Sequence, residues 1–153
     1  MEPVINKIHE FLLKNKKTIA VAESCTGGVL SGMLTKTPGS SGYFILGIVA
    51  YSNAAKEKIL KIPHRLIAKK GAVSREVAEG LAHSIRKLSG ADFGIGITGI
   101  AGPAGGSKEK PVGTVFIAVE SKNRKICQQF NFTGTRSAIR KKSALKTLGL
   151  LKN

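Results

Sequence analysis

Three neighbouring side chains in the stretch 22–28 can carry proton or nucleophile chemistry. Ser24 and Cys25 are potential nucleophiles, and Glu23 can accept or donate a proton. A nucleophile needs an activating base and donors that stabilise the charge it creates. These three residues can therefore act only if the fold brings such groups beside them.

The surroundings of this stretch predict a turn between a strand and a helix. A small and β-branched run at residues 18–21 precedes it, and a helix-like segment follows at residues 29–34. Ser24 and Thr26 are expected to cap that helix, while Gly27-Gly28 lets backbone amides approach an anionic ligand closely. The alternative is an ordinary capping turn without chemistry.

A second group of polar side chains follows the apolar run at residues 43–51. Asn53 is expected to cap a short helix over residues 54–60, which places Lys56 in the first turn of that helix. A cation is unfavourable there because a helix N-terminus carries partial positive charge. An anion or a catalytic task would explain the position of Lys56, and Tyr51 lies next to it at the strand end.

A glycine-rich loop at residues 98–107 leaves the end of another predicted strand. It begins at Thr98 and contains four glycines, whose free backbone amides can form a nest for phosphate. A disordered lid has a similar composition and is the alternative. Residues 94–99 match the G-x-G-x-x-G pattern, but they lie inside the strand, so a dinucleotide fingerprint is not supported. The loop glycines are Gly99, Gly102, Gly105 and Gly106.

The elements that must position these groups alternate between helices and strands. Strands are predicted at residues 18–22, 43–51, 93–98, 112–120 and 125–132, with helices at 3–17, 29–38, 54–60, 63–70, 74–90 and after Gly134. The continuous apolar run at 43–51 predicts a strand covered by helices on both faces. We expect a single α/β domain over residues 1–153, a three-layer α/β/α sandwich with a mixed sheet of about five strands. Ligands of such sheets bind at strand ends.

Composition narrows the possible partners. The 153 residues include 25 Lys and Arg against 9 Asp and Glu, a net charge of +16, which favours an anionic partner or reflects a lysine-biased composition. Aromatic residues make up only 5%, so nucleic acid is an unlikely partner. With two cysteines, no metal-ligand cluster, no secretory signal and no membrane-length apolar run, we expect a cytoplasmic protein without metal or cofactor.

Five motifs in sequence order give the chain a close resemblance to a known family. They are Ala22–Gly28, Pro38–Ser41, Val49–Asn53, Gly71–Ser74, and Thr98–Pro103 continuing to Lys110–Thr114. Along nearly its whole length the chain resembles the C-terminal domain of the CinA (competence/damage-inducible) family, which includes nicotinamide-nucleotide amidohydrolases of the PncC type. The resemblance implies a three-layer α/β/α fold, a homo-oligomer, and hydrolysis of nicotinamide mononucleotide to nicotinic acid mononucleotide and ammonia. Larger members carry an N-terminal domain linked to ADP-ribose pyrophosphatase activity, which is not carried over.

Amide hydrolysis assigns roles to the residues singled out above. Ser24 is expected to be the nucleophile, Lys56 its base if burial lowers the lysine pKa, and Tyr51 a relay or orienting group. Cys25 is the competing nucleophile. Amides near residues 26–28 would stabilise the oxyanion, and the glycine loop with Arg136 or Arg140 would hold the substrate phosphate. The expected substrate contacts are Glu23, Cys25, Thr26, Gly27, Gly28, Asn53, Thr98, Gly99, Gly102, Gly105, Gly106, Arg136 and Arg140.

Other functions remain open at this stage. A catalytically silent nucleotide-binding module would keep the same loops, and a nucleic-acid-binding protein would account for the charge but not for the glycine loops. The sequence also leaves open whether Ser24 forms an acyl-enzyme or activates water.

Overall fold

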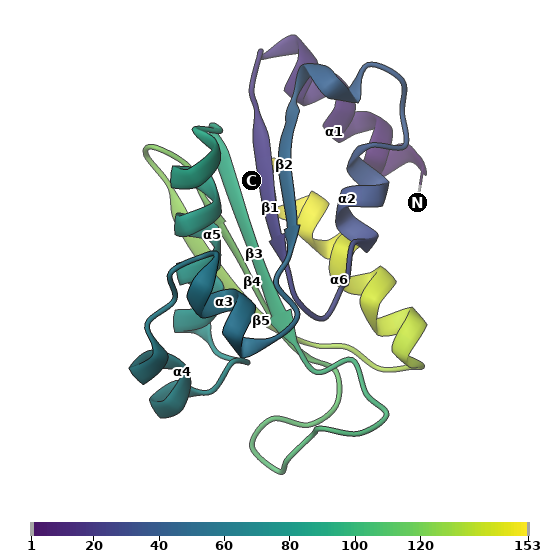
Figure 1. Ribbon diagram of the computed structural model, residues 1–153. Helices are drawn as coiled ribbons and strands as arrows, with labels where there is room; N and C mark the ends of the chain where they lie inside the picture. The colour runs from purple at the N-terminus through teal and green to yellow at the C-terminus, as the bar shows by residue number, and fades with distance from the viewer. Residues whose placement is uncertain (1, 153) are drawn as a thin grey trace.

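The computed structural model describes residues 2–152, and its centre is a five-stranded mixed sheet (Figure 1). The strand order is β2-β1-β3-β4-β5, with β2, β1 and β3 parallel and β4 and β5 antiparallel to their neighbours. The strands are β1 (Ile19–Glu23), β2 (Phe44–Val49), β3 (Phe93–Gly99), β4 (Thr114–Glu120) and β5 (Lys125–Asn131). The expected mixed sheet is confirmed.

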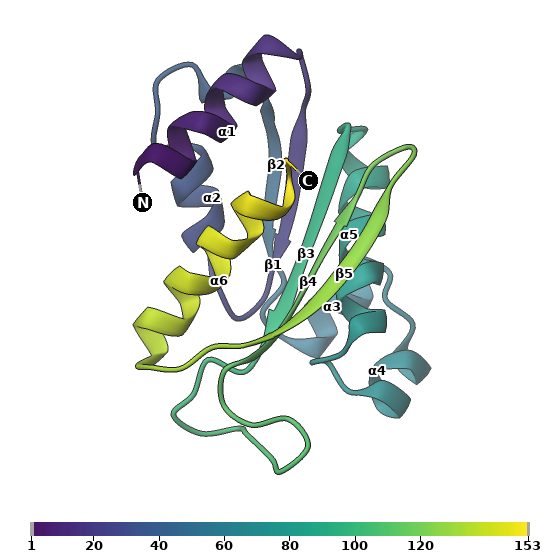
Figure 2. The ribbon, with the colours of Figure 1, turned by 180° about the vertical axis from the view of Figure 1, so that it is seen from behind.

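Helices cover both faces of this sheet (Figures 1 and 2). On one face lie α1 (Glu2–Lys14), α2 (Val29–Leu34) and α6 (Arg136–Leu150); on the other lie α3 (Asn53–Lys58), α4 (His64–Lys70) and α5 (Arg75–Ser89). A short 3-10 helix, η1, spans Ser40–Gly42. The expected helix–sheet–helix arrangement is therefore present, and no helix among residues 2–152 is long and apolar enough to cross a membrane.

Strand β1 connects the two hydrophobic cores. Every residue of β1 is buried, and successive side chains point to opposite faces of the sheet. Ile19 and Val21 pack in the core under α1, α2 and α6, while Ala20 and Ala22 pack in the core under α5. Because β1 is packed on both faces, its C-terminal end and the turn that follows are held in one position at the edge of the sheet.

The glycines inside β3 allow α5 to lie against the sheet. A Cβ added at Gly94 would lie 2.2 Å from the carbonyl oxygen of Ala82, and one at Gly96 would lie 2.2 Å from that of Ala78. Real Cβ atoms do not approach backbone oxygens so closely, so both positions require glycine. Helix packing thus explains the first two glycines of the dinucleotide-like pattern, and the third, Gly99, lies against Thr114 and Val115 of β4.

Strand β2 differs from the prediction that helices cover both of its faces, which was wrong. Its residues alternate between intermediate and exposed, and Ile45 and Val49 are each 48% exposed. The reason lies in the topology. Strand β2 is at the edge of the sheet, and the six-residue α2 is too short to cover all the side chains on that face of the strand. A continuous apolar run therefore did not indicate a central strand here.

The close packing of α5 on β3 yields a stability prediction. Gly96→Ala should lower the free energy of unfolding by about 1–3 kcal/mol, because the added methyl group must push α5 away from the sheet. The matched control is Gly149→Ala in α6, where a Cβ would meet nothing within 4 Å. That change should be neutral or slightly stabilising, since alanine favours a helix over glycine. Urea unfolding of the two variants checks this, and equal stabilities would contradict it.

Candidate active site

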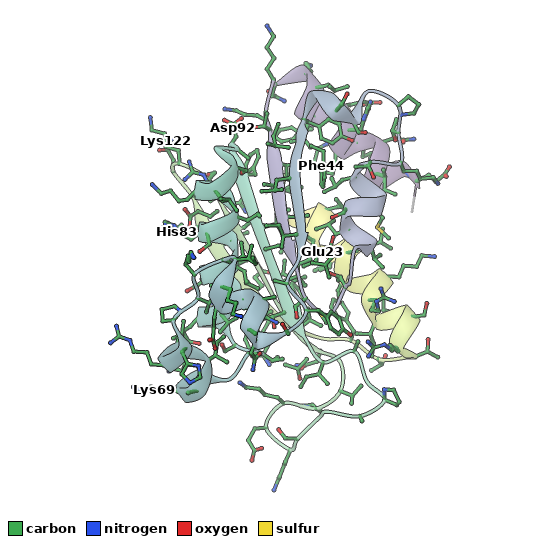
Figure 3. The ribbon with its side chains drawn as sticks, in the orientation of Figure 1. Glu23, Phe44, Lys69, His83, Asp92 and Lys122 are labelled. Carbon is green, nitrogen blue, oxygen red and sulfur yellow. The ribbon has the colours of Figure 1, made fainter. Side chains whose placement is uncertain are left out.

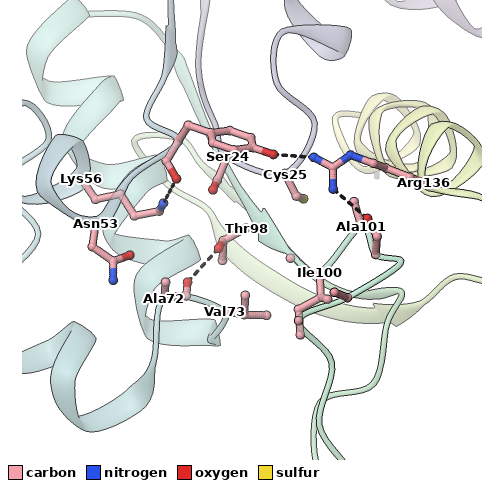
Figure 4. Close-up of a pocket in the computed structure, with 15 residues that line it drawn as sticks. Ser24, Cys25, Asn53, Lys56, Ala72, Val73, Thr98, Ile100, Ala101 and Arg136 are labelled. Atoms are coloured by element: carbon pink, nitrogen blue, oxygen red, sulfur yellow. Dashed lines mark hydrogen bonds between the residues drawn. The ribbon is translucent and has the colours of Figure 1, made fainter.

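A cavity of about 290 Å³ lies where β1 and β3 end and where the chain leaves β2 for α3 (Figure 4). Four separate parts of the chain supply its walls, together with Arg136 of α6. The lining residues are Ser24, Cys25, Tyr51, Asn53, Lys56, Ala72, Val73, Thr98, Gly99, Ile100, Ala101, Gly102, Ala104, Gly105 and Arg136. The strand ends that carry the predicted chemistry thus meet at one place, as expected for a sheet of this kind.

Glu23, labelled in Figure 3, does not line the cavity. Its side chain is completely buried and accepts four hydrogen bonds. One carboxylate oxygen accepts from the amides of Gly28 and Leu30, both at 3.1 Å. The other accepts from the amide and hydroxyl of Ser31, at 2.8 and 2.6 Å. The substrate contact expected of Glu23 is therefore replaced by a structural role at the start of α2.

This carboxylate also replaces the caps expected from Ser24 and Thr26, so that prediction was wrong. The N-cap position of α2 is Gly28, at φ +96°, and it makes no side-chain cap. A carboxylate beside a helix N-terminus satisfies amides that lack helical partners and interacts favourably with the positive end of the helix. Because Glu23 performs this task, the Ser24 hydroxyl is not used as a cap and lies on the cavity wall.

Residues 26–28, the second half of the turn, do not line the cavity. The amides of Gly27 and Gly28 donate to the Ser24 carbonyl and the Glu23 carboxylate, so neither is available to an oxyanion. The carbonyl of Thr26 accepts two hydrogen bonds from Arg140, from Nε at 3.2 Å and Nη2 at 2.9 Å. Thr26, Gly27, Gly28 and Arg140 thus do not line the cavity, which corrects their expected roles in binding the oxyanion and the phosphate.

Cys25 lines the cavity but is a poor nucleophile. Its residue is only 6% exposed, and burial raises the pKa of the thiol to about 12, with the negative charge of Glu23 acting in the same direction. Because the thiolate is the reactive form, a thiol with this pKa is essentially unreactive at neutral pH. The competition between Cys25 and Ser24 is therefore weighted towards Ser24.

Lys56 is the most deeply buried cation at the site, with 2% of its surface exposed. Its Nζ donates to the carbonyl of Ala50 at 2.9 Å and to that of Tyr51 at 3.4 Å, and no carboxylate among residues 2–152 pairs with it. Burial lowers the pKa of this amine, and the nearby Cys25 opposes the shift only in part. A lysine without a counter-ion in this setting is suited to accept a proton.

Lys56 is presented by α3, whose cap differs from the prediction. Ser52, not Asn53, is the N-cap, and its hydroxyl accepts from the amide of Ala55 at 3.0 Å. Serine and asparagine cap equally well, so adjacent candidates cannot be separated from sequence. Asn53 is the first residue of α3 and lines the cavity instead.

Arg136 and Tyr51 meet at the mouth of the cavity (Figure 4). The Tyr51 hydroxyl accepts from Arg136 Nη2 at 2.5 Å, and Arg136 Nη1 donates to the carbonyl of Gly102 at 2.8 Å. Both side chains are exposed, so a ligand can reach the guanidinium. Of the two candidate phosphate arginines, only Arg136 is at the cavity.

The family profile described as CinA C-terminal domain matches residues 1–153. The chain belongs to the CinA C-terminal domain family. It is 48% identical over 145 residues to a CinA-like protein of Desulfotalea psychrophila, a match that covers 95% of the chain and 35% of that relative. A CinA-like protein of Thermotoga maritima is 48% identical over 148 residues, covering 97% and 35%.

Solved structures of CinA relatives share the fold. The competence/damage inducible protein of Agrobacterium tumefaciens is 36% identical, with a TM-score of 0.96 over 99% of this chain and 93% of that one. A CinA superfamily protein of Escherichia coli is 29% identical, with a TM-score of 0.93 over 97% and 87%. The chain spans about a third of the length of the curated relatives above.

Sequence reasoning missed one wall of the site, formed by Ala72 and Val73 between α4 and α5. The carbonyl of Ala72 accepts from the Thr98 hydroxyl at 2.7 Å, which ties this wall to the end of β3. Small apolar side chains carry no chemical signal of their own. The Gly71–Ser74 motif, which the chain shares with the CinA family, was the available hint. Gly106, at the far end of the glycine loop, does not line the cavity.

The structural role of Glu23 can be tested by stability. Glu23→Gln should lower the free energy of unfolding by about 2–3 kcal/mol, because an amide nitrogen cannot accept the hydrogen bonds that this buried carboxylate receives. Glu10→Gln removes the same charge from an exposed site on α1 and should change stability by less than about 0.5 kcal/mol. Urea unfolding measures both. A Glu23→Gln protein as stable as the control would contradict the role.

Proposed function

We propose that this protein is an amidohydrolase that converts nicotinamide mononucleotide to nicotinic acid mononucleotide and ammonia. The observation that carries the proposal is the meeting of Ser24 with a buried lysine in one cavity, where Lys56 has no carboxylate partner among the described residues. Membership of the CinA family, to which the PncC-type amidohydrolases belong, supports the same chemistry.

The hydrogen bonds of Lys56 suit it to act as the base. A neutral amine has two hydrogens and one lone pair, and the carbonyls of Ala50 and Tyr51 can take both hydrogens. The lone pair is then left to accept the Ser24 proton as the hydroxyl attacks the carboxamide carbon. When the tetrahedral intermediate collapses, the C–N bond breaks and Lys56 returns the proton to the departing ammonia. Water then hydrolyses the acyl group from Ser24.

Substrate recognition falls to the groups at the mouth of the cavity. Arg136 offers a guanidinium, which forms strong paired hydrogen bonds with phosphate, and the loop from Thr98 to Gly105 adds polar backbone beside it. Arg140 has no such role, because it does not line the cavity and its Nε and Nη2 donate to the carbonyl of Thr26. The alternative of a silent nucleotide-binding module would retain these contacts while Ser24 and Lys56 carried out no reaction.

Substitutions at Ser24, Lys56 and Cys25 test the catalytic assignment. Ser24→Ala and Lys56→Met should each lower kcat for ammonia release by about a thousandfold or more, and the double variant should be little worse than either single one. Cys25→Ala should keep most of the activity. Binding of the mononucleotide, measured by calorimetry, should survive in all four. Binding without turnover in the wild-type protein would favour the silent module, and an inactive Cys25→Ala beside an active Ser24→Ala would reverse the assignment.

The pH dependence of kcat reports the base. Burial lowers the pKa of Lys56, so its neutral form is populated at a lower pH than for a free lysine. A group that must lose a proton to act makes the rate rise with pH and level off above its pKa. We therefore expect kcat to rise through an apparent pKa well below about 10.4, the value of a free lysine. A flat profile from pH 6 to 10 would exclude Lys56 as the base.

Removing the phosphate from the substrate tests recognition by Arg136. Nicotinamide riboside should be hydrolysed with a kcat/KM about 10- to 100-fold lower than the mononucleotide, because it loses charge-assisted hydrogen bonds. Arg136→Met should remove most of this preference. Lys141→Met removes an exposed charge from the same helix and should preserve it. Equal kcat/KM for both substrates in the wild-type protein would show that the phosphate is not recognised.

A further inference from the structure

Two walls of the cavity come from segments that are distant in sequence. One wall belongs to the loop between β3 and β4, residues 100–113, which projects beyond the end of the sheet (Figures 1 and 2). The other consists of Ala72 and Val73, in the connection between α4 and α5. Neither segment is part of a helix or strand, so tertiary contacts must set the distance between the walls.

Lys110 joins these two walls from outside the cavity. It lies in the loop, and its Nζ donates to the carbonyl of Lys70 at 3.0 Å and to that of Val73 at 2.5 Å. Lys70 is the last residue of α4, where carbonyls lack helical partners and a cation is favoured. The ammonium group therefore binds one carbonyl at the end of α4 and one in the Ala72–Val73 wall, while the Lys110 backbone remains in the loop between β3 and β4.

The loop holds Lys110 in a defined position. The amide of Lys110 donates to the Ser107 hydroxyl at 3.0 Å, and the amide of Ser107 donates to the Lys110 carbonyl at 2.9 Å. The root of the loop is closed by the amide of Gly113, which donates to the Ile100 carbonyl at 2.7 Å. The lysine thus lies in a small turn closed by hydrogen bonds. If its side chain moved, the backbone of the loop would have to move with it.

Two other hydrogen bonds hold the first half of the loop. Thr98 binds the carbonyl of Ala72 where the loop leaves β3, and Arg136 holds the carbonyl of Gly102 on the side of α6. Lys110 supplies two hydrogen bonds to the α4–α5 connection from the returning half of the loop. Without them, the described residues in that half of the loop would make no hydrogen bond to this segment.

We propose that Lys110 is a positioning residue, which fixes the distance between the glycine loop and the Ala72–Val73 wall and thereby sets the affinity of the cavity for its nucleotide. It lines no part of the cavity and takes no part in the chemistry. The proposal rests on the proposed function only for the identity of the nucleotide. The mechanical link itself can be tested without any substrate.

Hydrogen–deuterium exchange tests the link directly. In Lys110→Met, amides of residues 71–74 and 100–113 should exchange about tenfold faster, because two hydrogen bonds that resist local opening are lost. Lys108→Met removes an exposed charge from the same loop and should leave exchange unchanged. Lys110→Arg, which keeps donors for both carbonyls, should restore most of the protection. Exchange that is unchanged in Lys110→Met, or raised equally in Lys108→Met, would overturn the link.

Kinetics test the consequence for the site. Lys110→Met should raise KM for nicotinamide mononucleotide about tenfold and change kcat by less than about twofold, because a positioning residue affects binding more than the chemical step. A fall in kcat with unchanged KM would overturn the positioning role. If the wild-type protein released no ammonia while exchange still responded to Lys110→Met, the proposed function would fail and the link between the walls would stand.

Discussion

The buried carboxylate of Glu23 is the interaction on which the site depends. A charged group without exposure to water is stable only when hydrogen bonds replace its hydration, and Glu23 obtains four from the start of α2. Those bonds fix the path of the chain between the end of β1 and the first turn of α2. Ser24 lies on that path, so its position follows from the satisfaction of the carboxylate.

A second restraint, from α6, holds the same turn. Arg140 of α6 donates twice to the carbonyl of Thr26, and the left-handed conformations of Gly27 and Gly28 let the chain bend between the two anchors. Within residues 23–28, the groups that hold the fold together are thereby separate from the groups that reach the cavity. The groups that face the interior bind the protein itself, and Ser24 and Cys25 face the cavity.

The sequence predicted the elements well because hydrophobic periodicity reports burial, and it located the strand ends that form the site. It could not predict which residues of a turn face the ligand. Glu23, Thr26 and Arg140 have the same chemical types as binding residues, and only their partners in the fold show that they are structural. The exposure of β2 was missed for a related reason, since strand order is not encoded in the composition of one strand.

The surroundings of Lys56 show why the Glu23 carboxylate must bind elsewhere. Burial lowers the pKa of a lysine, whereas a nearby carboxylate stabilises the charged form and raises the pKa again. Glu23 is next to Ser24 in the sequence, yet its carboxylate accepts hydrogen bonds from the start of α2. It forms no ion pair with Lys56. The hydrogen bonds that build the turn thus direct the Glu23 carboxylate to the start of α2, and burial lowers the pKa of Lys56 without an ion pair to oppose it.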